Sequence, residues 1–235
     1  MTEIRLAQLQ SSLFIKGLVI RDKAVFAGRL NAASGAAFDG DIAIPPIPDD
    51  AIPDAPRMLL RSKDGTLVCN VSQRRLDLVF MQPAVNTHKI QLPHAPLGDL
   101  ALKLRDVLAP AAGNQIDRAS LVSNWLVALD QSGRDFLRAR FLRDGSPAGQ
   151  ADDIEVHALE HPSVAGCEVN QWVRCSTARK ADDPTADGYV TVLVDINTNA
   201  EKVYDFTGPL LGDFLVEAQQ LTAALLSRFI GTAQP

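Results

Sequence analysis

The chain lacks most of the patterns that identify an enzyme or a nucleic-acid-binding protein. Neither G-x-x-x-x-G-K nor G-x-G-x-x-G occurs in it, so no glycine-rich loop is predicted to hold a phosphate. Aromatic residues make up only 6% of the chain, and the net charge is -5. A protein that grips the phosphate backbone of DNA or RNA usually carries a basic balance. We therefore do not expect a nucleic-acid partner.

Cysteine and long apolar runs are also scarce. The three cysteines are widely spaced, which argues against a disulfide framework and for reduced thiols. Cys69 and Cys167 lie in apolar, strand-like runs and are expected in the core. No run approaches the ~18 apolar residues of a membrane span, and the start from Met1 to Leu6 lacks the character of a secretory signal. These features predict a cytoplasmic protein without a membrane span.

What the chain does contain is one order of elements written twice. The turn Asp64-Gly65 leads into a strand-like run at 67–71, and apolar residues at helical spacing follow at 97–108. Later Asp187-Gly188 leads into the strongest strand-like run, and 210–230 is again helical. Short connections between strands favour antiparallel pairing. The repeated order predicts an α+β fold with two antiparallel sheet-plus-helix halves, consistent with an internal duplication.

The polar stretch from Ser146 to Asp153 is the best candidate linker. It divides the chain into a half at 1–149 and a half at 150–235, which can also form one continuous domain. Further elements follow from alternation, β-branched content or helical spacing. The expected strands lie at 13–20, 24–28, 58–61, 76–80, 116–129, 154–158 and 167–173, and a short basic helix is expected at 134–143.

Prolines cluster between Pro45 and Pro56. They fix φ and remove backbone donors, so this segment must run extended across the surface. We expect it to pack on its own sheet, anchored by Ile44, Ile47 and Ile52. The alternative is a docking strip, because Pro53 and Pro56 have the P-x-x-P spacing that proline-binding modules recognise.

Two carboxylates stand out because they lie within strands. Asp77 and Asp195 are both on the strand face opposite the main apolar stripe. Such carboxylates can pair with arginines, for which Arg118 and Arg174 are candidates, either as structural ion pairs or as part of a partner-binding surface. An enzyme with a site assembled from Asp77, His88, Arg118 and Asp195 is the alternative.

Metal, cofactor and anion sites have weaker support. His157 and His161 have the i, i+4 spacing of helical zinc ligands, but the alternation around them is strand-like and would separate the two imidazoles by ~13 Å. No serine or cysteine has an elbow-type signature. We therefore expect no metal, no cofactor and no catalytic nucleophile. Arg134 and Arg138 belong to the only dense basic patch, which could bind an anion or pair locally with nearby aspartates.

Parts of the chain resemble a known group of proteins. The segments 56–65 and 70–77, the run from Arg118 to Asn124, and the ending Arg228-Phe229-Ile230 are similar to a sporadically distributed family of uncharacterised bacterial proteins. Ser120 stands where that family has glycine. The resemblance implies no activity, and the patchy distribution of the family would suit cargo of mobile elements or defence loci.

The absence of catalytic motifs and the paired apolar layout together favour a non-catalytic binding or accessory protein. The uncovered sheet faces would pack against each other within the chain or across the twofold axis of a homodimer. The expected ligand is a protein partner. A chaperone of the SecB-like kind, which also combines antiparallel strands, helices and an acidic surface, is a more specific version of this hypothesis.

Overall fold

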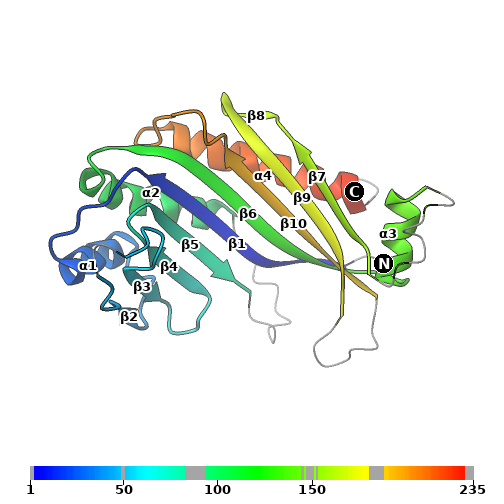
Figure 1. The fold of residues 1–235 in the computed structure, drawn as a ribbon. Coiled ribbons are helices and arrows are strands. Elements are labelled where there is room, and N and C mark those ends of the chain that lie inside the picture. The colour runs from blue at the N-terminus through cyan, green and yellow to red at the C-terminus, as the bar shows by residue number, and fades with distance from the viewer. Residues whose placement is uncertain are drawn as a thin grey trace.

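The computed structural model describes residues 3–48, 51–82, 94–143, 146, 151, 153–179 and 188–230. The fold is α+β, as the sequence predicted, with a ten-stranded antiparallel sheet and four helices in the described ranges (Figure 1). The first part of the chain forms β1 (Glu3–Ile15), α1 (Lys23–Ala33), β2 (Ile42–Ala43), β3 (Met58–Arg61), β4 (Leu67–Val71), β5 (Arg75–Met81) and α2 (His94–Ala111). The second part forms β6 (Ile116–Ala128), α3 (Gly133–Phe141), β7 (Glu155–Glu160), β8 (Ser163–Val164), β9 (Cys167–Ala178), β10 (Tyr189–Thr198) and α4 (Leu210–Ile230).

The two parts repeat one order of elements. Leaving aside the two-residue strands β2 and β8, each part runs strand, helix, three strands, helix. In each part the first strand pairs with the last one, β1 with β5 and β6 with β10. The repeat of elements begins again at β6, after residues 112–115. The division of the chain into domains at 1–149 and 150–235 stays a prediction.

The two halves are joined edge to edge. The strand order is β2-β3-β4-β5-β1-β6-β10-β9-β7, and the long antiparallel pair of β1 and β6 lies at the junction. The halves therefore contribute to a single continuous sheet. The expectation that their uncovered faces pack against each other within the chain is wrong, because both halves expose the same side of that sheet.

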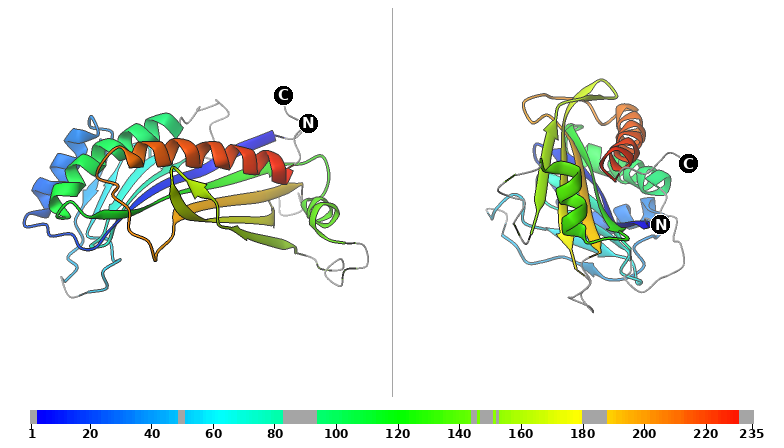
Figure 2. Two further views of the ribbon diagram at one scale, coloured as in Figure 1. Left: turned by 90° about the horizontal axis from the view of Figure 1, so that it is seen from above. Right: turned by 90° about the vertical axis from the view of Figure 1, so that its right-hand side faces the viewer.

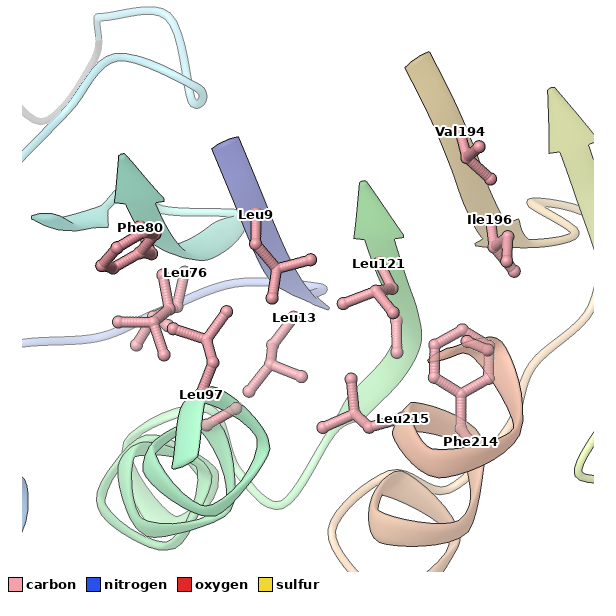
Figure 3. Close-up of a cluster of buried hydrophobic side chains, with 14 of the residues drawn as sticks. Leu9, Leu13, Leu76, Phe80, Leu97, Leu121, Val194, Ile196, Phe214 and Leu215 are labelled. Atoms are coloured by element: carbon pink, nitrogen blue, oxygen red, sulfur yellow. The ribbon is translucent and has the colours of Figure 1, made fainter. Parts of the chain in front are cut away.

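Helices α2 and α4 lie side by side across one face of the sheet, and α1 packs beside α2 (Figure 2). The core lies between this layer and the strands. Leu9 and Leu13 of β1 meet Leu97 of α2, and Phe214 of α4 lies under β10 (Figure 3). Burying each large apolar side chain contributes about 1.5–3 kcal/mol. Among the described helices, none combines the length and apolar character needed to cross a membrane.

Several predicted elements are confirmed. The Asp64-Gly65 turn joins β3 to β4, with Gly65 at a φ of 71°, a conformation that glycine adopts without strain. The predicted strands at 58–61, 67–71, 76–80 and 116–129 correspond to β3, β4, β5 and β6, and the predicted terminal helix is α4. Cys69 and Cys167 are buried, as expected, and so is Cys175.

The predicted opening pair of strands is wrong. The first strand, β1, begins at Glu3 and ends at Ile15, and the predicted strand at 24–28 is part of helix α1. The missed signal is Asp22, whose carboxylate accepts a hydrogen bond from the Val25 amide at 3.0 Å and caps the helix. An aspartate in this position satisfies an amide that has no partner within the helix.

The proline segment is held by an arginine, and of its three isoleucines only Ile47 is half-buried. Ile44 and Ile52 are exposed, so they do not anchor it. Arg57 is only 3% exposed, and its guanidinium donates to the carbonyl oxygens of Ile47, Pro48 and Ala51. The segment thus packs within the molecule, as expected, but through polar contacts to its carbonyls.

Candidate functional site on the open face of the sheet

The face of the sheet opposite α2 and α4 is the main candidate surface. No described helix lies across it (Figures 1 and 2). Because side chains alternate along a strand, every second residue points to this side, which we call the open face. It includes Leu59 and Arg61 of β3, Val68 and Asn70 of β4, Arg75, Asp77, Val79 and Met81 of β5, Glu3, Arg5, Gln8, Gln10, Ser12 and Phe14 of β1, Arg118, Ser120, Val122, Asn124, Leu126 and Ala128 of β6, Tyr189, Thr191, Leu193, Asp195 and Asn197 of β10, Asn170, Trp172, Arg174 and Ser176 of β9, and Glu155, His157 and Leu159 of β7.

A polar row crosses the open face. Register pairs Asn70 with Asp77, Asp77 with Ser12, and Ser12 with Ser120. The row continues through Asn197 to Asn170 on the second half of the sheet. Ser12, Asp77 and Ser120 in the middle of the row are buried, whereas Asn70, Asn170 and Asn197 are partly exposed. Because an amide group both donates and accepts hydrogen bonds, these asparagines can meet either kind of group on a ligand.

Asp77 is the most tightly held member of this row. Its carboxylate accepts hydrogen bonds from Ser12 Oγ at 2.6 Å and Gln10 Nε2 at 3.2 Å. Arg75 Nε donates to the other carboxylate oxygen at 2.8 Å. The side chain of Asp77 is only 7% exposed, so the charge is both buried and paired. Asp77 therefore forms a structural ion pair with Arg75, and not with Arg118 or Arg174.

Arg118 lies beside this cluster without joining it. Its guanidinium carbon is 4.6 Å from the centre of the Phe14 ring, and that of Arg75 is 5.9 Å from the same ring. A guanidinium over an aromatic face contributes about 0.5–1 kcal/mol where solvent is near. Arg118 thus stacks on Phe14 and forms no ion pair with any described residue.

Asp195 is in a different electrostatic situation. Among the described residues its side chain has one hydrogen-bond partner, Asn197, whose Nδ2 donates at 3.0 Å. Burial raises the pKa of Asp195 above its ordinary value, and the Asn197 hydrogen bond offsets only part of that rise. A partly buried carboxylate without a cation is costly. Residues of this kind are enriched at functional sites, because a ligand can supply the missing partner.

The two aspartates do not share one site. Strands β1 and β6 lie between β5, which carries Asp77, and β10, which carries Asp195. Three inter-strand spacings of ~4.8 Å separate them by roughly 14 Å. His88, the fourth member of the hypothetical catalytic set, lies outside the described residues. The described residues of that set are therefore not assembled into a catalytic constellation.

The edge of the open face at β7 combines apolar and charged groups. Leu159 and Trp172 are register partners, 42% and 41% exposed. Arg174 Nε lies 3.5 Å from Glu155, and His157 Nε2 lies 3.0 Å from the same carboxylate. Arg174 thus pairs with Glu155 and not with Asp195, contrary to the sequence-based expectation.

The remaining candidate residues lie elsewhere. Arg138 of α3 lies 3.4 Å from Asp135, so the basic patch includes a local ion pair; anion binding there stays a hypothesis. His161 contacts Asn170 at 3.0 Å and does not meet His157. In the described ranges, no group of three or more His, Cys, Asp or Glu side chains could hold a metal ion. Burial raises the pKa of the Cys175 thiol to about 11, so this thiol is protonated at neutral pH.

No protein-family model matches the chain, and a search of the curated proteins gives no match either. The resemblance to a sporadic bacterial family therefore stays a prediction. Function must be inferred from the surface itself.

Proposed function

We propose that this protein is a non-catalytic binding protein that recognises a partner polypeptide through the open face of its sheet. One observation carries the proposal: the long described helices α2 and α4 pack on one side of a sheet whose other side has no helix across it. Eight principal strands, about 4.8 Å apart, span roughly 34 Å. The area of the face is therefore comparable to the ~800 Å² that one partner contributes to a standard interface.

The composition of the open face supports this function. It carries five arginines, Arg5, Arg61, Arg75, Arg118 and Arg174, together with Phe14, Trp172, Tyr189 and Met81, and none of its residues is a lysine. Arginine, aromatic residues and methionine are enriched at protein interfaces, whereas lysine is depleted. The face is therefore closer in composition to an interface than to a solvated surface.

The mixture of apolar and polar groups favours a polypeptide as the ligand. Leu126, Leu193 and Trp172 can contact apolar side chains, and the partly exposed asparagines of the polar row can bond to backbone amides and carbonyls. A SecB-like chaperone, which holds unfolded chains, is the specific version of this proposal, and a partner encoded by a mobile element or defence locus is another. Both rest on architecture alone.

Affinity capture with face-specific variants tests the proposal. In Leu126→Asp/Leu193→Asp, two charges replace half-buried side chains on the open face, and we expect the partner captured by the unmodified protein to be lost. Val216→Asp is the matched control, because Val216 is 55% exposed on α4, away from the open face. A partner retained by the open-face variant, or lost equally by both variants, would contradict the proposal.

The chaperone version has its own readout. The chain has two tryptophans, so Trp125→Phe leaves Trp172 as the only indole. An unfolded model polypeptide, reduced and alkylated, should shift the Trp172 emission to shorter wavelength as water is displaced from the ring. No shift at any concentration of the unfolded polypeptide would remove the chaperone version and leave the recognition of a folded partner in place.

A further inference from the structure

The loop between β1 and α1 holds apolar side chains in solvent at fixed positions. Val19 is 78% exposed, and Val25 of α1 is 59% exposed. The backbone around them is tied down, because the Leu18 amide donates to the Gln73 carbonyl at 2.9 Å and the Val19 amide donates to the Ala111 carbonyl at 3.4 Å. Exposed apolar groups on a fixed backbone give a partner a surface that needs little ordering.

Two hollows adjoin this loop and share Val19 and Ile20. The first, of about 230 Å³, is lined by Leu18, Val19, Ile20, Lys23, Arg57, Ser72 and Gln73. The second, of about 390 Å³, is lined by Val19, Ile20, Arg21, Asp22, Val25, Phe26, Arg29, Pro110 and Ala111. Small-molecule sites usually measure about 300–1,000 Å³. One hollow is smaller than this range and the other lies near its lower end, so each suits a single side chain of a longer ligand.

The charge of these hollows is opposite to that of the whole chain. Four cations line them, Arg21, Lys23, Arg29 and Arg57, against the single carboxylate of Asp22. Asp22 is already engaged as the cap of α1. The chain as a whole has a net charge of -5, whereas the surface around the two hollows is positively charged.

The arginines of the hollows lack carboxylate partners. Within the described part of the chain, neither Arg21 nor Arg29 forms an ion pair, and the buried Arg57 is met by carbonyl oxygens alone. The C-terminus of α2 works against the binding of an anion, because the helix ends at Ala111 beside the second hollow. The partial negative charge of a helix C-terminus is worth about 0.3–1 kcal/mol, and the full positive charges of Arg21 and Arg29 outweigh it.

We propose that these two hollows bind an acidic peptide segment that carries apolar side chains. The apolar side chains enter the hollows beside Val19 and Val25, and the carboxylates face Arg21 and Arg29. Charge complementarity selects an anionic ligand, and the two hollows favour a peptide over a membrane surface, because single side chains of a peptide can enter them. The inference is independent of the open face, because none of the lining residues belongs to it.

A fluorescein-labelled ten-residue peptide, with two leucines among aspartates and glutamates, tests the proposal by fluorescence anisotropy. We expect binding that weakens when salt is raised from about 0.05 to about 0.5 M, since exposed charges are screened. The variant Arg21→Glu/Arg29→Glu should weaken binding at least about tenfold. Both side chains are exposed, so the fold should tolerate the changes, which circular dichroism verifies.

The matched control is Arg143→Glu/Arg179→Glu, which changes the net charge by the same amount at exposed positions outside both hollows. Retained binding in this control, with loss in Arg21→Glu/Arg29→Glu, supports the site. Equal loss in both variants would show non-specific attraction and overturn it. Undiminished binding after serine replaces the leucines of the peptide, or binding to anionic lipid vesicles without binding to the peptide, would overturn it as well.

Discussion

Two carboxylates on one face of the sheet illustrate how burial and pairing decide the role of a residue. Asp77 is buried with Arg75, Ser12 and Gln10 as partners, so its charge is compensated within the fold. Asp195 has one amide partner and a pKa raised by burial. The first is part of the structure, whereas the second is the better candidate for contact with a ligand.

We predict that Asp195→Asn raises the free energy of unfolding at pH 7 by about 0.5–1 kcal/mol, because the amide removes the cost of a partly buried charge. The carboxyl pKa is higher in the folded state than in the unfolded state. Below the unfolded pKa of about 4 the carboxyl group is protonated in both states, and Asp195 does not lower the stability. The stability of the unmodified protein then decreases as pH rises through the folded pKa, because the partly buried carboxyl group becomes charged.

Urea denaturation at several pH values measures this effect. The advantage of Asp195→Asn should be absent at acidic pH and grow toward neutral pH. An unfolding free energy equal to or below that of the unmodified protein at pH 7 would contradict the assignment. If Asp195 contacts the partner, the same variant should also weaken partner binding, so that stability and binding change in opposite directions.

Asp64 gives the opposite pH dependence. Its carboxylate accepts hydrogen bonds from Ser62 Oγ at 2.6 Å and from the amide and hydroxyl of Thr66, and these bonds lower its pKa, with Ser62 as the largest cause. The stabilisation is present above the unfolded pKa of about 4 and is lost as pH falls through the folded pKa.

Asp64→Ala should lower the free energy of unfolding by only about 0.5 kcal/mol at pH 7, because the side chain is exposed. In thermal unfolding, this cost should vanish at low pH; a cost that does not change with pH would refute the hydrogen-bonding explanation.

At the scale of elements, Arg57 holds the proline segment and α4 covers the second half of the sheet. We predict that Arg57→Lys destabilises the protein by about 2–4 kcal/mol, because a lysine ammonium cannot reach three carbonyls with the fork geometry of a guanidinium. Guanidinium chloride denaturation measures the change. Arg61→Lys, at an exposed position of the neighbouring strand β3, is the control and should change stability by less than about 0.5 kcal/mol. Equal effects of the two substitutions would show that the carbonyl contacts do not hold the segment.

Helix α4 supplies Phe214, which is fully buried. Phe214→Ala should cost about 3–5 kcal/mol through lost burial and the cavity left behind. On the same helix, Val216 is 55% exposed, and Val216→Ala should be close to neutral. Calorimetric unfolding distinguishes these values, and a small cost for Phe214→Ala would mean that α4 does not cover the core as described.

The elements that could be predicted from sequence were those with clear periodicity. Strand β10 alternates strictly and α4 shows an apolar stripe, so both were found. Helix α1 was missed because Val25, Phe26 and Gly28 resemble a strand when the capping by Asp22 is not recognised. The pairing of Arg75 with Asp77 could have been read from sequence, because residues two apart share one face of a strand. The contact of Arg118 with Phe14 could not, because it depends on the register between two strands far apart in the chain.

At the scale of the whole molecule, the edge-to-edge union of two similar halves explains why a large surface stays uncovered. Each half contributes one long helix, α2 or α4, to the same side, so no described helix lies across the other side of the continuous sheet. The sequence predicted two halves but not how they meet, because the junction of β1 with β6 depends on pairing between segments more than 100 positions apart.

Site-specific photo-cross-linking tests most directly whether the open face binds a partner. A photoreactive amino acid is placed at Asn124, in the middle of the open face, or at Val216 on the outer side of α4, and the protein is irradiated in the cells that produce it. We expect a discrete cross-linked polypeptide from position 124 that is absent from position 216. Cross-links of equal yield from both positions, or none from position 124, would contradict the account.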